Sequence, residues 1–137
     1  MASFFSLFGI GKSQNFKVGQ VWSYKTRGQE PNSRLQILKI DSISTKDKFV
    51  HIAIGDLKIA TTEEGRFVDK IGHLPMSEVA LRKSVVKLIS KKEPLPDFQE
   101  GYGMWREAFD AGKAGVFEVS VAEAVQFVEE TYKQNGL

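Results

Sequence analysis

The stretch RLQILKIDSISTKDKFVHIAIGDLKIA, residues 34–60, decides the fold that this sequence predicts. It contains two segments rich in β-branched residues, 35–43 and 48–54, separated by a polar turn, and a third segment begins at Leu57. Runs of this kind between turn residues are typical of β-strands joined in hairpins. We therefore expect an antiparallel sheet organised around these strands.

The apolar residues of segment 35–43 do not keep a single alternating phase. Leu35 and Ile37 lie on one phase, whereas Leu38 and Ile40 lie on the other. Because side chains alternate between the two faces of a strand, this pattern predicts either a β-bulge or burial of both faces.

Further strand patterns flank this stretch. Residues 20–26 alternate and carry Trp22 and Tyr24, and residues 57–62 and 67–74 continue the series towards Pro75. These segments predict a meander of four or five sequential strands, to which the short segment 116–119 adds one more.

Three helical patterns accompany the predicted sheet. The first spans 78–90 after Ser77, and most of its apolar residues fall on one half of the helical wheel. The second begins at Asp97, which with Glu100 is similar to a capping box, and the third begins with a capping box at Ser120. The predicted fold class is α+β: an antiparallel sheet of five or six short strands with two or three C-terminal helices packed on it.

An aromatic stripe marks the second of these helices. Phe98, Tyr102, Trp105 and Phe109 recur at the i, i+4, i+7, i+11 spacing of one helix face. That spacing is the signature of a face that packs on the core.

The size and composition indicate one ordered domain. The chain has 137 residues, 42% hydrophobic and 26% charged, which is ordinary for a globular protein and argues against disorder of the whole chain. We expect an apolar tail at 1–15 and a single α+β domain at 16–137. The chain has no cysteine, which excludes disulfides and thiolate sites and fits a cytoplasmic protein.

The apolar beginning of the chain, MASFFSLFGIG, is too short to span a membrane, and no transmembrane segment is predicted. It also lacks the basic region and cleavage site of a signal peptide. We expect it to pack on the domain, on a partner or on a membrane surface, and packing on a second copy would support a homo-oligomer.

Charge is distributed unevenly along the sequence. Residues 1–92 contain 16 Lys and Arg against 8 Asp and Glu, whereas residues 93–137 contain 3 against 9. This division predicts either two faces of opposite potential or simply acidic solvent-facing helices. If the faces exist, Glu100, Glu107 and Asp110 are the candidate acidic contacts for a protein partner.

No catalytic, cofactor or metal motif is complete. The sequence GIGKS at 9–13 lacks the first glycine and the preceding strand of a phosphate-binding loop, and no G-x-S-x-G is present. His51 and His73 have no metal-ligand spacing, so neither a metal nor a cofactor is predicted. His73 precedes a strand-to-helix junction, where a binding role or an unfamiliar enzyme site could lie.

The basic first half allows a nucleic-acid interpretation. Trp22 and Tyr24 share a strand face, and with Lys25, Arg27 and Arg34 nearby they would form a stacking and phosphate-contact platform. The other interpretation is that the two aromatic residues belong to the core face of the sheet, since large exposed aromatic patches are unusual. Tyr24, Arg27 and Arg34 are candidate binding residues under the first interpretation.

The second half resembles a recurring pattern in a family of small bacterial α+β proteins with no assigned activity. The resemblance rests on GHLPMS at 72–77, on Glu100-Gly101-Tyr102 followed by Trp105 and Phe109, on Gly115-Val116-Phe117 and on the final capped helix. It implies no catalytic residue. In general character the chain is similar to immunity proteins, so the first hypothesis is a non-enzymatic protein-binding domain such as an immunity or adaptor protein.

Overall fold

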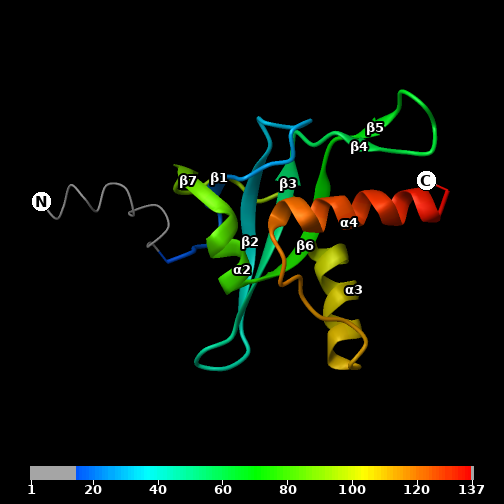
Figure 1. Ribbon diagram of the computed structural model, residues 1–137. Coiled ribbons are helices and arrows are strands. Elements are labelled where there is room, and N and C mark those ends of the chain that lie inside the picture. Colours follow the sequence, from blue (N-terminus) through cyan, green and yellow to red (C-terminus); the bar gives the residue numbers. More distant parts are fainter. Residues whose placement is uncertain (1–14, 137) are drawn as a thin grey trace, which may run out of the picture.

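The computed structural model describes residues 15–136, so the predictions for the tail at 1–15, including its role in oligomers, lie almost wholly outside the described part of the chain (Figure 1). The elements follow in the order β1 (Val21–Tyr24), β2 (Arg34–Ser42), β3 (Lys48–Gly55), β4 (Ile59–Ala60), β5 (Phe67–Val68), β6 (Ile71–Ser77), α2 (Glu78–Ser84), β7 (Val85–Ser90), α3 (Gln99–Asp110) and α4 (Val121–Gln134).

The architecture is α+β, as the sequence predicts. A five-stranded antiparallel sheet has the strand order β6-β3-β2-β1-β7, and β4 and β5 form a separate two-stranded sheet. The meander is therefore confirmed for β1, β2 and β3, with β6 as the next strand. None of the helices in the described part of the chain has the length and apolar character needed to cross a membrane.

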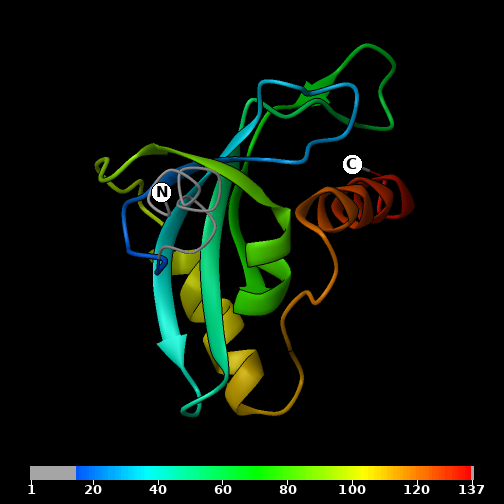
Figure 2. The ribbon, with the colours of Figure 1, turned by 60° about the vertical axis from the view of Figure 1, so that its left-hand side comes forward.

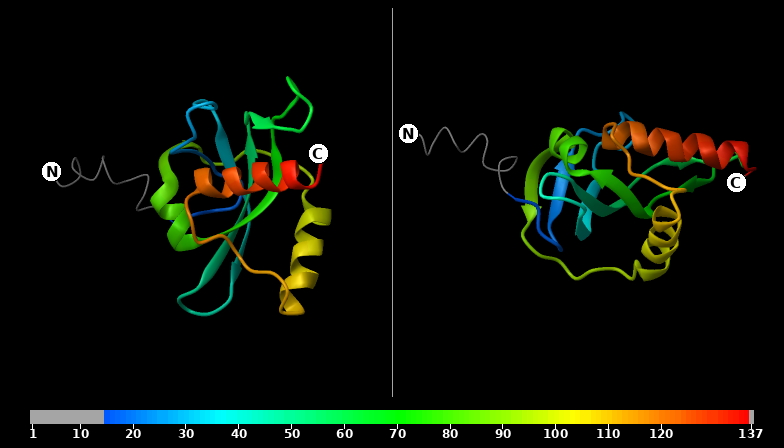
Figure 3. Two further views of the ribbon diagram at one scale, coloured as in Figure 1. Left: turned by 45° about the vertical axis from the view of Figure 1, so that its right-hand side comes forward. Right: turned by 90° about the horizontal axis from the view of Figure 1, so that it is seen from below.

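The two faces of the sheet are covered by different helices (Figures 2 and 3). On one face, α2 and α4 pack on the main core, where Leu81 and Val125 join Ile37, Val50 and Ile52. On the other face, α3 places its aromatic stripe against residues of β3, with Phe109 lying 5.6 Å from Phe49 between ring centroids. The stripe therefore faces the sheet, although none of the residues of α3 is fully buried.

The predicted β-bulge is present in β2. The register with β3 shifts between Ile37, which lies opposite Ile52, and Lys39, which lies opposite His51. The shift keeps Leu35, Ile37 and then Ile40 on the face of the main core. Without it, Asp41 would share the phase of Ile37 and point into the core, so the bulge turns Asp41 towards α3.

The prediction of one helix over 78–90 is wrong in its second half. Helix α2 ends at Ser84, and Val85 already has an extended backbone. Residues 85–90 form β7, which pairs with β1 at the edge of the sheet. Because the run contains three β-branched apolar residues and β1 offers an unpaired edge, strand pairing prevails over the helical period.

Three smaller expectations also change. Of residues 57–62, only Ile59 and Ala60 form a strand, the short β4, which pairs with β5 rather than joining the main sheet. Within the described chain, segment 116–119 contributes a single bridge from Phe117 to Met76. The N-cap of α3 is Phe98 rather than Asp97, whose carboxylate accepts a hydrogen bond from Gln99 N. The caps at Ser77 and Ser120, the latter with a full capping box, are confirmed.

Candidate functional site

The two histidines of the chain meet on the face of the sheet that α3 covers. His51 lies in β3 and is completely buried, and His73 lies in the adjacent edge strand β6 and is half-buried. The antiparallel pairing of the strands places His51 opposite Pro75, next but one to His73. Residues 22 positions apart in the sequence therefore become neighbours.

A chain of hydrogen bonds runs from Asp41 through both imidazoles. Asp41 Oδ2 lies 3.0 Å from His51 Nε2, and His51 Nδ1 lies 2.9 Å from His73 Nε2. A carboxylate only accepts, so His51 carries its proton on Nε2 and its Nδ1 must accept from His73 Nε2–H. Because the neutral imidazole of His73 carries its proton on Nε2, its Nδ1 is unprotonated and can accept a hydrogen bond.

The geometry of the two rings supports an in-plane hydrogen bond. Their centroids are 5.0 Å apart and their planes differ by only 15°. Face-to-face stacking would require the two nitrogens to lie well beyond 2.9 Å, so the rings meet edge to edge. Tyr102 and Trp105 close the space around His51, with centroids 4.9 and 4.7 Å from its ring.

Asp41 collects donors from α3 as well. The Tyr102 hydroxyl donates to Asp41 Oδ2 at 2.9 Å, and Arg106 Nη1 lies 3.8 Å from the same oxygen. Trp105 Nε1 donates at 2.7 Å to the carbonyl of Gly115, which joins α3 to the segment that follows it. The carboxylate thus holds β2, β3 and α3 together at one point.

Both imidazoles are held neutral at ordinary pH. Burial, and to a lesser extent the neighbouring His51, lower the pKa of His73 to about 4. Burial also lowers the pKa of His51, against the opposing effect of its hydrogen bond to Asp41. Burial, and then the bond to Asp41, raises the pKa of Tyr102, so this hydroxyl stays protonated and donates.

The free nitrogen of His73 is open to solvent. Every buried side-chain nitrogen and oxygen of the described residues has a hydrogen-bond partner. No bond involving His73 Nδ1 occurs among residues 15–136, so that atom is not enclosed. His73 lines a surface hollow of about 360 Å³ together with Glu100, Asp97 and Phe98, and the backbone of Gly72 and Gly101 completes it.

Gly101 explains how α3 comes so close to β6. A Cβ atom at this position would lie 3.2 Å from Cβ of His73. The glycine of the helix thus admits the side chain of His73, which a larger residue at this position would crowd. A Cβ atom at Gly103, by contrast, would have no neighbouring atom within 4 Å.

The residues predicted to bind a partner are distributed over several places. His73 and Glu100 line the same hollow. Glu107 and Asp110 are exposed on α3, where Asp110 accepts from Arg106, and Arg34 is exposed at the start of β2. Tyr24 is buried, and its hydroxyl is bonded to Ser33, so it takes no part in a surface platform.

Arg27 also serves the interior rather than a surface. Its guanidinium makes two bonds to Glu30, at 2.7 and 2.9 Å, and a third to Glu129 at 3.2 Å. The exposed fractions of these three side chains are 8%, 1% and 8%. Since Trp22 is buried as well, the stacking platform of the nucleic-acid interpretation is not formed.

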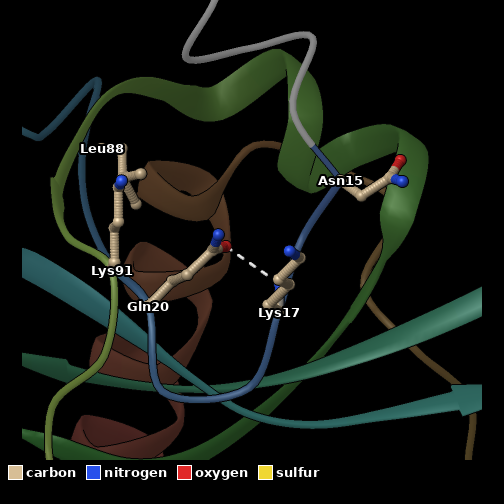
Figure 4. A pocket seen from close by; sticks show the side chains of 5 residues that line it. All are labelled: Asn15, Lys17, Gln20, Leu88 and Lys91. Atoms are coloured by element: carbon tan, nitrogen blue, oxygen red, sulfur yellow. Dashed lines mark hydrogen bonds between the residues drawn. The ribbon is translucent and has the colours of Figure 1, made fainter.

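A further hollow near the N-terminal end of the described chain is lined by Asn15, Lys17, Gln20, Leu88 and Lys91 (Figure 4). Gln20 Oε1 accepts from Lys17 N at 2.9 Å and from the indole of Trp22 at 3.0 Å. The amide oxygen is therefore occupied within the fold, and the hollow offers mainly the two lysines.

Sequence reasoning missed most of the groups around His51. Asp41, Tyr102 and Arg106 reach the histidines only through the register of β2 with β3 and the docking of α3. The one signal in the sequence is Gly101, because a glycine within a helix can mark a place where another part of the chain comes close. Here that neighbour is His73. Within residues 15–136 no three His, Asp or Glu side chains are arranged to hold a metal ion.

No family model matches the sequence, and no curated protein or solved structure is significantly similar to it.

Proposed function

We propose that this chain is a non-enzymatic protein-binding domain, such as an immunity or adaptor protein, and that the hollow between β6 and α3 contacts its partner. The observation that carries the proposal is the meeting of His73 and Glu100 in that hollow. Both residues are candidates from the sequence alone, and they come from separate elements of the fold.

The chemistry of the hollow favours a basic side chain of the partner. The hollow offers the unprotonated Nδ1 of His73 and the carboxylates of Asp97 and Glu100 as acceptors, with the ring of Phe98 beside them. Lysine and arginine side chains carry only donors, and a cation is also attracted to an aromatic face. Among the described residues 15–136, no lysine or arginine lines the hollow.

We expect charge reversal at Glu100 to abolish capture of the partner. The tagged protein would be used to recover partners from a lysate of cells that naturally produce it, with and without nuclease. A protein that the wild type retains both with and without nuclease should be lost with Glu100→Lys, because the new cation repels a basic side chain of the partner. It should be retained with Glu64→Lys, a matched reversal in the turn between β4 and β5.

Equal capture by both variants would remove the β6–α3 hollow from the proposal. Capture that disappears after nuclease treatment would instead indicate nucleic acid as the partner, which is the second possibility that the basic first half of the sequence raises.

The hydrogen-bond chain favours one alternative function, an enzyme in which His73 accepts a proton. A proton taken up at Nδ1 would be matched by movement of His73 Nε2–H towards His51 and of His51 Nε2–H towards Asp41. A His73→Gln variant keeps a donor for His51 but cannot accept a proton in this way. Unchanged turnover in this variant, for any reaction that the wild type catalyses, would contradict the alternative.

A further inference from the structure

The segment that joins α3 to α4 forms an additional, incomplete strand beside β6. Phe117 lies opposite Met76 in a parallel bridge. Its carbonyl accepts from Ser77 N at 2.9 Å, and its own N–H donates to the Pro75 carbonyl at 2.9 Å. The connection runs along the outside of the sheet, so residues 115–119 are the outermost layer at the β6 edge (Figure 2).

The outer side of this segment is open. In an extended chain, the N–H and C=O groups of successive residues point to opposite sides. Those of Phe117 point to β6, so those of Val116 and Glu118 point outwards. No backbone hydrogen bond to either residue occurs in the part of the chain that the structure describes. An unpaired edge of this kind is a template for another strand.

Hollows of different character lie on the two faces of the open edge. Phe117 and Val119 line one hollow of about 400 Å³ with Phe127 of α4, whose side chain is 57% exposed. Val116 and Glu118 line the other hollow, of about 520 Å³, which is of mixed character. We call it the Val79 hollow, and its further lining residues include Phe49 and Val79 together with the charged Lys46, Asp47, Lys48 and Glu78. A strand added at this edge would direct alternate side chains into the two hollows, which is how β-strand addition obtains its specificity.

The charges beside the Phe127 hollow indicate the kind of side chain that fits there. Its remaining lining residues are Glu123, Gln126 and Glu130, and none of the lysines and arginines in the described part of the chain lines it. The charges that line the Phe127 hollow are therefore of one sign, and basic residues of an added strand would complement them there. The Val79 hollow holds Lys46 and Lys48 as well as carboxylates, so it favours neither sign.

We propose that residues 115–119 bind an extended segment of a partner protein as an added strand. Every second residue of that segment enters the Phe127 hollow, where two basic residues flank an apolar one. The intervening residues are uncharged and enter the Val79 hollow beside Phe49 and Val79. This surface is separate from the β6–α3 hollow and does not depend on it, because Glu100 and His73 line neither of its two hollows.

The test uses a five-residue peptide of alternating design, acetyl-Lys-Val-Val-Val-Lys-amide. Peptide residues 1, 3 and 5 are designed to enter the Phe127 hollow, and peptide residues 2 and 4 are designed to enter the Val79 hollow. Titration into the full chain, followed by amide chemical shifts, should give shifts at residues 115–119 and 127. The matching peptide with glutamate in place of both lysines should bind at least about tenfold more weakly.

Strand pairing has a signature that simple apolar contact lacks. The peptide would be methylated on alternate amide nitrogens, on residues 2 and 4 in one version and on residue 3 in the other. Because only every second N–H of an added strand faces its neighbour, one version should lose binding and the other should retain it within about twofold. Equal loss or equal retention in both versions would overturn the proposal.

Protein variants complete the test. Glu130→Lys should remove the preference for the lysine peptide, whereas Glu107→Lys on α3 should leave it unchanged. Glu118→Pro removes an outward N–H and should weaken binding about tenfold, with the amide spectrum used to verify that the fold is kept. An unaltered lysine preference in Glu130→Lys, or shifts confined to residues outside 115–119, would contradict strand addition at this edge.

Discussion

Replacing Arg27 with methionine should lower the free energy of unfolding by about 3–5 kcal/mol, the range seen when one partner of a buried ion pair is removed. The change would leave the carboxylates of Glu30 and Glu129 facing each other with no cation between them. Methionine fills similar volume, so the loss reports mainly the uncompensated charge. Urea unfolding at neutral pH, followed by tryptophan fluorescence, would measure the difference.

The size of this effect follows from how many parts of the chain the guanidinium joins. Besides the two carboxylates, it donates to Gln126 at 2.9 Å and to the carbonyl of Lys58 at 3.2 Å. The carboxylates in turn accept from Lys58 N at 2.8 Å and Ala60 N at 2.6 Å. One network therefore holds the loop after β1, the start of β4 and helix α4.

Two comparisons isolate the buried charge. Arg66→Met, at an exposed arginine between β4 and β5, should change stability by no more than about 0.5 kcal/mol. The double variant Arg27→Met with Glu129→Gln should recover part of the loss, since it removes one of the two unpaired charges. Additive losses in the double variant would show that Arg27 and Glu129 act independently.

This network also bears on the uneven charge of the sequence. Arg27 belongs to the basic first 92 residues and Glu129 to the acidic remainder. Their buried contact shows that the two halves meet inside the fold. One of the two interpretations of the sequence placed Arg27 on a phosphate-contacting surface, because a lone arginine in a turn carries no sign of a partner 102 positions away.

Local signals in the sequence predicted local structure well. The change of phase between Ile37 and Leu38 located the bulge, and Ser77 and Ser120 located two helix starts. Each of these features depends on residues a few positions apart, so no knowledge of the distant chain is needed.

Residues 85–90 show where such reasoning fails. Their apolar residues satisfy the helical period when they are read together with 78–84, yet Val85 and Val86 are also good strand residues. The choice between the two depends on an unpaired edge of β1, which is a tertiary feature. The histidine pair is hidden for the same reason, since it needs both the pairing of β3 with β6 and the bulge that turns Asp41 towards α3.

Acid should destabilise the protein through His73, and the direction follows from its pKa. The folded protein holds this pKa at about 4, below the ordinary value of 6.5. Between these two pH values the unfolded chain binds a proton that the folded chain does not, so the free energy of unfolding falls as the pH is lowered through this window. At pH 7 and above this contribution is constant.

The matched variant for this experiment is His73→Gln, whose amide can still donate to His51 Nδ1 but does not titrate. From pH 7 to pH 4.5 the wild type should lose about 1–3 kcal/mol more than the variant, since one pKa unit corresponds to about 1.4 kcal/mol and His73 is only half-buried. The comparison subtracts the carboxylates, whose titration both proteins share. Parallel pH profiles would contradict a depressed pKa at His73.

Nitrogen chemical shifts of the imidazoles would test the proton positions along the hydrogen-bond chain separately from the stability. At pH 7 both His51 and His73 should carry their proton on Nε2, because Asp41 orients the first ring and the first ring orients the second. An Asp41→Asn variant replaces the carboxylate with an amide that can also donate, so the order along the chain is no longer imposed. Mixed tautomers in that variant, with uniform ones in the wild type, would establish that one carboxylate fixes the proton positions out to the solvent-facing nitrogen of His73.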